Sequence, residues 1–191
     1  RLNNSFDGIV NFATNENGGV LFNGNIDLKL NNTLNKGEKF ELFWNSIAEE
    51  RQEFKIATEI PYILNSKFTP KLSFSIYQQD STFLNTTFHS ELFFNLNSRT
   101  KIALTYNSES SENLKENINS IIETYNNIFL GFRILYRIPR NDFFFNDKFY
   151  FEINPTVGRR NTNLNSSNQF KIRGSTSYIW DLNLRNSIYI K

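Results

Sequence analysis

The chain has 191 residues, a formal net charge of +2 and 21 Lys and Arg residues spread along its length. This even spread gives no basic patch for nucleic acid, and the absence of Cys excludes disulfides and thiolate metal sites. Aromatic residues make up 16% of the chain, with 20 Phe and 8 Tyr, a composition that favours strands over helices. The sequence therefore predicts an all-β protein.

Hydrophobicity is distributed rather than concentrated. Mean hydropathy is −0.48, and no stretch approaches the roughly 18 continuous apolar residues of a membrane helix. A strand that exposes one face to lipid and the other to water has the same soluble-looking average. The sequence opens at Arg1 without an initiator Met or an apolar leader, which predicts an internal segment of a longer protein.

The first half of the chain alternates apolar and polar residues with a period of two, which is typical of strands. Turn signals rich in Asn, Gly, Ser and Thr separate the runs. The apolar positions of these runs are Phe22, Ile26, Leu28 and Leu30; Phe40, Leu42 and Trp44; Phe54, Ile56 and Ile60; Leu72, Phe74 and Ile76; and Leu84, Phe88, Leu92, Phe94 and Leu96.

The same pattern continues in the second half. Its apolar positions are Ile128, Leu130, Phe132, Ile134, Tyr136 and Ile138; Phe149, Phe151 and Ile153; and Phe170, Ile172, Tyr178 and Trp180. We expect an antiparallel up-and-down meander of about eleven strands, many about ten residues long, without a boundary between domains in 1–191. Strands of that length match a tilted span of the hydrocarbon core.

One segment interrupts the alternation. Leu114, Ile118, Ile121, Ile122 and Tyr125 recur at helical spacing, and Ser111 is available as a cap, which predicts a short amphipathic helix in a loop over 113–125. The alternative is an extended loop that continues two strands.

Alternation alone does not say whether the apolar face points into a core or out into lipid. Three features favour lipid, and so a transmembrane β-barrel. The polar face carries charges on strand after strand, which suits a water-filled lumen. Apolar runs end in aromatic residues such as Trp44, Tyr106 and Trp180, where an interfacial girdle would lie. A long meander also needs closure to protect its edges.

Candidate sites are few, and no catalytic, metal-binding or cofactor-binding site is predicted. His89 is the only histidine, so neither a triad nor a multi-histidine metal site has the residues it needs. Within a barrel, Arg133, Arg137, Glu152 and Arg159 are the candidate lumen charges. They could form a stripe that contacts an acidic substrate or a lipid headgroup, or be the ordinary charges of strands that line water.

Several segments carry a family resemblance. These are Asn4-Ser-Phe-Asp-Gly-Ile-Val-Asn-Phe12, Leu21-Phe-Asn-Gly-Asn-Ile-Asp-Leu-Lys-Leu30, Asp80-Ser-Thr-Phe-Leu-Asn85 and Gly131-Phe-Arg-Ile-Leu-Tyr-Arg-Ile-Pro-Arg140, followed by Pro155-Thr-Val-Gly158. They resemble strands in the N-terminal part of the barrel of the BamA/TamA-like outer-membrane assembly family, also called the bacterial surface-antigen family.

The resemblance implies a barrel of sixteen strands, of which 1–191 would be an incomplete part, and periplasmic POTRA domains that this segment does not contain. It implies location in the bacterial outer membrane, contact with its lipid, and unfolded outer-membrane proteins as clients. Periplasmic or lipoprotein accessory subunits are further partners that it suggests. It also places Asn107 to Asn127 outside the cell.

The first strand is the candidate functional element. In the family that the chain resembles, this strand meets the last one along a weak seam, and an opened seam can template incoming strands. Gly8 and Asn11 are poor strand formers, although an ordinary first strand also tolerates them. The candidate seam residues are Phe6, Asp7, Gly8, Ile9, Val10, Asn11 and Phe12.

Three functions follow as hypotheses. The first is a barrel that inserts or translocates outer-membrane proteins through a lateral seam, without covalent chemistry. The second is a passive outer-membrane pore or solute transporter. The third is a soluble β-barrel binding protein, in which the alternation would be inverted so that the apolar face forms a core.

Overall fold

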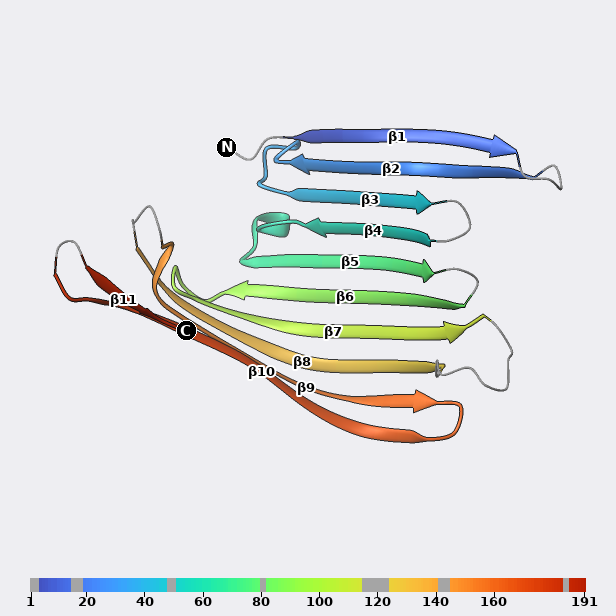
Figure 1. Ribbon diagram of the computed structural model, residues 1–191. Coiled ribbons are helices and arrows are strands. Elements are labelled where there is room, and N and C mark those ends of the chain that lie inside the picture. Colours follow the sequence, from blue (N-terminus) through green and yellow to red (C-terminus); the bar gives the residue numbers. More distant parts are fainter. Residues whose placement is uncertain are drawn as a thin grey trace.

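The computed structural model describes residues 4–14, 19–47, 51–79, 82–114, 124–140, 145–183 and 186–191. These residues form one sheet of eleven antiparallel strands, each hydrogen-bonded to the strands before and after it in the chain (Figure 1). The described helical structure is a single 3-10 turn, η1 (Ile63–Asn65). None of the described helices is long and apolar enough to span a membrane.

The strands are long, as the sequence predicts. Ten of them have between 9 and 16 residues, whereas globular strands more often have about five or six. Their bounds are β1 Ser5–Thr14, β2 Val20–Asn31, β3 Lys39–Ile47, β4 Arg51–Glu59, β5 Phe68–Gln79, β6 Phe83–Asn95, β7 Thr100–Asn113, β8 Tyr125–Pro139, β9 Asp147–Thr162, β10 Ser166–Asp181 and β11 Ser187–Ile190.

The all-β, up-and-down prediction is thus confirmed, including the number of strands. Among the described residues the sheet is open, because β1 pairs only with β2 and β11 only with β10. Of the segment 113–125, for which a helix or an extended loop was expected, residues 115–123 lie outside the described part of the chain.

Register keeps the two faces of the sheet chemically distinct. Paired residues share a face, and pairs such as Ile26 with Trp44 and Leu104 with Phe132 build what we call the apolar face. Pairs such as Lys71 with Glu91 build the polar face. Nearly all charged residues of the strands lie on the polar face; the described exceptions, all near strand ends, are Glu112, Asp147 and Arg159.

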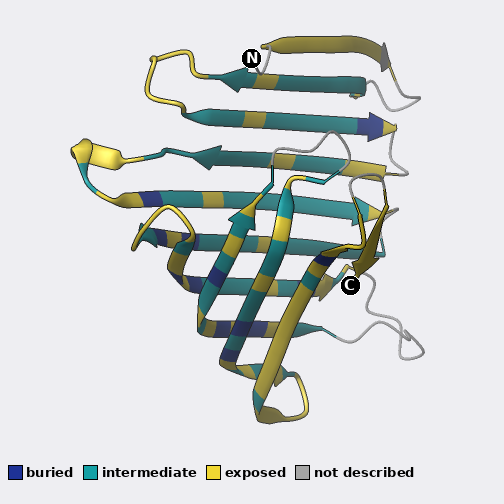
Figure 2. Ribbon diagram, turned by 90° about the vertical axis from the view of Figure 1, so that its left-hand side faces the viewer, coloured by how far each residue is buried: buried dark blue, intermediate teal, exposed yellow. Residues whose placement is uncertain are grey.

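The polar face is the more buried of the two. The buried residues of the described chain all lie on it except Ser46, whereas Leu104 (68% exposed) and Leu130 (59% exposed) stand open on the apolar face. Because these strands form a single layer, only curvature can crowd one face, so the polar face is concave. Figures 1 and 2 show this curl, in which the later strands swing across the earlier ones.

Two glycines permit a close approach between β8 and β9. A Cβ atom on Gly158 would lie 2.2 Å from the carbonyl oxygen of Ile128, and one on Gly131 would lie 2.4 Å from that of Pro155. Phe129 pairs with Gly158 in the register, and its buried ring fills the space that a side chain there would need. The sheet can therefore bend here without a gap on its concave side.

The turn between β2 and β3 shows how Asn and Gly set the connections. Asn32, Asn35 and Gly37 all have positive φ angles, a conformation that these residue types tolerate best. The Glu38 carboxylate accepts hydrogen bonds from the backbone N–H groups of Leu34 and Lys36. These bonds hold the pKa of Glu38 below its ordinary value, since they favour the charged form.

Candidate functional site

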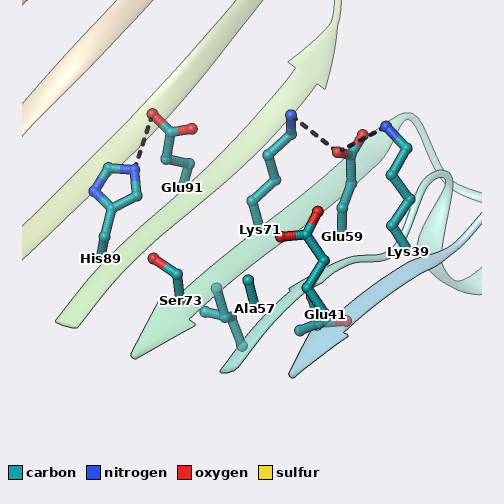
Figure 3. Close-up of a pocket in the computed structure, with 10 residues that line it drawn as sticks. Lys39, Glu41, Ala57, Glu59, Lys71, Ser73, His89 and Glu91 are labelled. Atoms are coloured by element: carbon teal, nitrogen blue, oxygen red, sulfur yellow. Dashed lines mark hydrogen bonds and ion pairs between the residues drawn. The ribbon is translucent and has the colours of Figure 1, made fainter. Parts of the chain in front are cut away.

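The polar face carries two chains of paired charges. The first joins β3, β4 and β5: the Glu59 carboxylate lies 3.1 Å from Lys71 Nζ and 3.5 Å from Lys39 Nζ. Figure 3 shows both lysines pointing toward this carboxylate. The three residues occupy directly opposite positions in the register, so the strand pairing itself brings the charges together.

The second chain of charges joins β6, β8 and β9. Arg133 Nη2 lies 2.9 Å from Glu91 Oε1, and Arg133 Nε lies 3.3 Å from Glu152 Oε1. The contact with Glu91 is an ion pair by distance rather than an aligned hydrogen bond, since that oxygen has no hydrogen-bond partner of good geometry. His89 lies on the other side, with Nε2 3.4 Å from Glu91 Oε1.

Arg133 reaches Glu91 across an intervening strand. On β7, Ala103 faces Arg133 and Thr105 faces Glu91, and both small residues are almost fully buried. The guanidinium can therefore pass over β7 without a steric obstacle. Removing one member of a buried pair leaves a charge without compensation, so this network stabilises the curl only while it is complete.

The four predicted lumen charges do not all lie on the same face of the sheet. Arg133 and Glu152 are in contact, and Arg137 lies on the same face beside Tyr150 in the register. The prediction that Arg159 lies on the polar face is wrong. Arg159 pairs with Ile128 and Asn168 and lies on the apolar face. The reason is that successive residues of a strand point to opposite faces, so the neighbouring Arg160 lies on the polar face instead.

The predicted seam strand is an edge strand. All of β1 whose burial is described is exposed, including Phe6 (71%) and Phe12 (78%), and β2 is its one partner. Its pairing with β2 places Asp7 directly opposite Asp27, a like-charge pair. Lys29 Nζ lies 2.9 Å from Asp27 Oδ2 and compensates one of these charges. At Gly24 the two backbones come so close that a Cβ atom would lie 1.9 Å from the Ile9 carbonyl oxygen.

Two of the cavities on the polar face lie among its charged residues. One of about 190 Å³ is lined by residues of β3 to β6, among them Lys39, Glu41, Glu59, His89 and Glu91 (Figure 3). The other, of about 300 Å³, is lined by residues of β6 to β10. The part of the chain that the structure describes contains no group of three His, Asp or Glu residues placed to hold a metal ion. These cavities are suited to binding charged groups.

Glu91, Glu59, Lys71 and Lys39 were not singled out from the sequence. Their signal lies in the register: oppositely charged residues occupy facing polar positions on neighbouring strands. A second signal is the pair of small residues on β7 between two strands with long charged side chains. Both signals can be recognised only when the pairing of each strand is known.

No protein-family model matches this chain, and no curated protein is significantly similar to it in sequence.

Proposed function

We propose that this chain is part of an outer-membrane β-barrel that helps insert other outer-membrane proteins, with β1 as a lateral seam. One observation carries the barrel: the sheet is inverted, with its apolar face convex and exposed and its charges on the concave face. A soluble sheet would bury Leu104 and Leu130 rather than Glu91. Lipid outside and water inside satisfy both faces.

The size of the apolar face supports contact with a bilayer. On β8 it runs without interruption from Ile128 to Ile138, which is roughly 33 Å at about 3.3 Å per residue. Tilted by about 40°, such a strand crosses roughly 25 Å, the height of the apolar band in known membrane barrels.

The residues at the two ends of this apolar face are of the kinds expected at a membrane–water interface. At one end, rings of Tyr136, Phe149 and Tyr178 form a row across β8, β9 and β10, with centroids 5.9 and 6.3 Å apart. Aromatic residues gather at membrane interfaces because their rings suit the headgroup region. At the other end the apolar face turns polar, at Arg159 and Asn168.

The seam rests on the edge position of β1 and on the family resemblance. An edge strand offers a row of unpaired N–H and C=O groups to an incoming strand. The carboxylates of Asp7 and Asp27 face each other across this pairing, although Lys29 offsets part of their repulsion through its ion pair with Asp27. The pore alternative draws its support from the charged concave face, which would also suit the passage of small solutes.

The test of the barrel is a spin-label accessibility experiment on the full-length protein in lipid vesicles. The described segment contains no Cys, so a single Cys at Leu104 or Ile172 gives one nitroxide on the apolar face. Matched labels at Asn107 and Arg173 lie on the polar face. We expect oxygen, which enters lipid, to relax the first pair, and a water-soluble nickel chelate to relax the second. Equal exposure of both pairs to the chelate contradicts the membrane assignment.

The test of the seam is a photo-crosslinker placed at Asn11 on β1, with Asn45 on β3 as the matched control. Both are polar-face asparagines, but β3 has strand partners on both sides. During outer-membrane protein synthesis we expect crosslinks to newly made proteins from position 11 alone. A passive pore predicts crosslinks from neither position.

A further inference from the structure

The cavity of the polar face that lies between β6 and β10 has no role in the function proposed above. It measures about 300 Å³ and is enclosed by the curl, with Thr87 and His89 of β6 on one side and Lys171 and Arg173 of β10 on the other. Other lining residues are Asn107 and Glu109 of β7, Phe129 of β8, and Asn154 and Thr156 of β9. Its volume is at the lower end of the range for small-molecule sites.

Two cations of this cavity have no carboxylate partner. Among the described residues Arg173 makes no ion pair or hydrogen bond, and Lys171 Nζ only lies 3.9 Å from the centre of the Phe129 ring. They stand two residues apart on one strand, so they point to the same side about 7 Å from each other. Two positive charges thus converge on one space.

The carboxylates nearby are already engaged. Glu109 accepts a hydrogen bond of 2.8 Å from the Tyr125 hydroxyl. Glu152 is paired with Arg133 and accepts a hydrogen bond from the Tyr150 hydroxyl. Glu91 is paired with Arg133 and faces His89. Glu91 and Glu152 are thus paired with Arg133, whereas Glu109 keeps its negative charge beside the neutral Tyr125 hydroxyl. The lining therefore holds two cations, Lys171 and Arg173, against one carboxylate, a positive excess of one.

A buried amide adds a directed polar group. Asn154 is 5% exposed, and its Oδ1 atom has no hydrogen-bond partner. The oxygen and nitrogen of an Asn amide have almost the same shape and can exchange places. When the Asn154 amide turns over, its N–H donors face the cavity. An anion held by Arg173 and Lys171 would give this buried amide the partner it lacks.

From this geometry we infer that the cavity between β6 and β10 binds a small, water-soluble phosphate-bearing anion. The planar guanidinium of Arg173 matches two phosphate oxygens, Lys171 supplies a second charge, and the Asn154 amide donates to a third oxygen. The cavity lies on the polar face, away from the apolar one, which favours a dissolved solute. This inference does not depend on the seam or on the membrane.

The test is a titration of the full-length protein, folded in detergent micelles, with inorganic phosphate at constant ionic strength. Binding is read from the ³¹P line width of phosphate. We expect saturable binding that weakens by at least about tenfold in the double variant Lys171→Gln, Arg173→Gln, because charge-assisted hydrogen bonds are lost. Lys171→Arg keeps the charge and should keep the binding.

The matched control is Lys101→Gln, Arg137→Gln. These residues are on the same face and carry the same total charge, but they do not line the cavity. A loss as large as that of the first double variant would show diffuse attraction and overturn the site, as would binding that does not saturate.

A second variant, Asn154→Asp, guards against misfolding of the first. It removes no cation and adds a negative charge within the cavity, so binding should weaken while the fold is kept. Unchanged binding in a folded Asn154→Asp variant would contradict the site. Phosphate binding and spin-label accessibility are separate readouts, so this inference and the proposed function can fail independently.

Discussion

The two halves of the sheet differ in what they bury. In β1 to β5 the strands have 9 to 12 residues, and Ser46 and Thr69 are the only buried residues that the structure describes there. In β6 to β10 the strands have 13 to 16 residues and hold the other described buried residues, including Glu91, Thr105 and Asn154. Curvature, rather than a second layer, makes the interior of this sheet, and that interior is polar.

The largest expected effect is at the glycine contact of the curled half. In Gly158→Ala the new Cβ would lie 2.2 Å from a backbone oxygen, which cannot move like a side chain. We expect a loss of about 3 kcal/mol in the free energy of unfolding, measured by urea denaturation in lipid vesicles with tryptophan fluorescence.

Gly8→Ala in the flatter half is the control for this substitution. Its Cβ would meet the tip of the Phe6 ring at 3.2 Å, which a small rotation relieves, so the change should stay within about 0.5 kcal/mol. Equal losses in the two variants would mean that the curl does not depend on the close approach of β8 and β9.

An intermediate effect is expected at the ion pairs. Arg133→Met leaves Glu91, whose side chain is 6% exposed, without its closest cation. We expect a cost of about 2 kcal/mol, below the range for fully buried pairs because the Arg133 side chain is 22% exposed.

Lys39→Met is the counterpart in the flatter half. The Lys39 side chain is 43% exposed and Glu59 keeps its second partner, Lys71, so we expect a cost below about 1 kcal/mol. The comparison is made by the same urea denaturation. If Lys39→Met lowers the free energy of unfolding more than Arg133→Met does, the ion pairs of the curled half are not the more stabilising ones.

The smallest effect concerns the turn at Glu38. Its pKa is lowered in the folded protein, first by the hydrogen bond from Leu34, so the charged form stabilises the turn. This contribution is present above the ordinary pKa of 4.5 and is lost as the pH falls through the lower folded value. Amide hydrogen exchange of Leu34 and Lys36 should speed up over that range.

Glu38→Gln is the matched variant for this prediction. It lacks the titrating group, so exchange at Leu34 and Lys36 should lose the additional acid-induced acceleration seen with glutamate. If both proteins show the same profile after correction for intrinsic exchange, the carboxylate does not hold the turn.

The sequence was sufficient for the strands and for most of their faces. Period-two alternation depends on local backbone geometry alone, so residues such as Ile26 and Leu130 could be assigned to the apolar face directly. Arg159 was assigned to the polar face by its charge, although adjacent residues of a strand point to opposite sides and its neighbour Arg160 takes that face. That error is avoidable from the sequence.

The curl and its contacts could not be predicted in the same way. The pairing of Arg133 with Glu91 depends on a register across two interfaces, β6 with β7 and β7 with β8. The bend depends on Gly131 and Gly158 meeting backbone from the neighbouring strand. A glycine in a strand indicates close approach in general but does not name the partner.

The strand order has a consequence for folding kinetics. All the strand pairings described join strands that are neighbours in the chain. The entropy lost on each pairing is therefore that of closing one connection, which grows slowly with its length. The sheet can therefore assemble hairpin by hairpin, without waiting for distant segments to meet. A substitution in one hairpin should delay that step while leaving earlier pairings able to form.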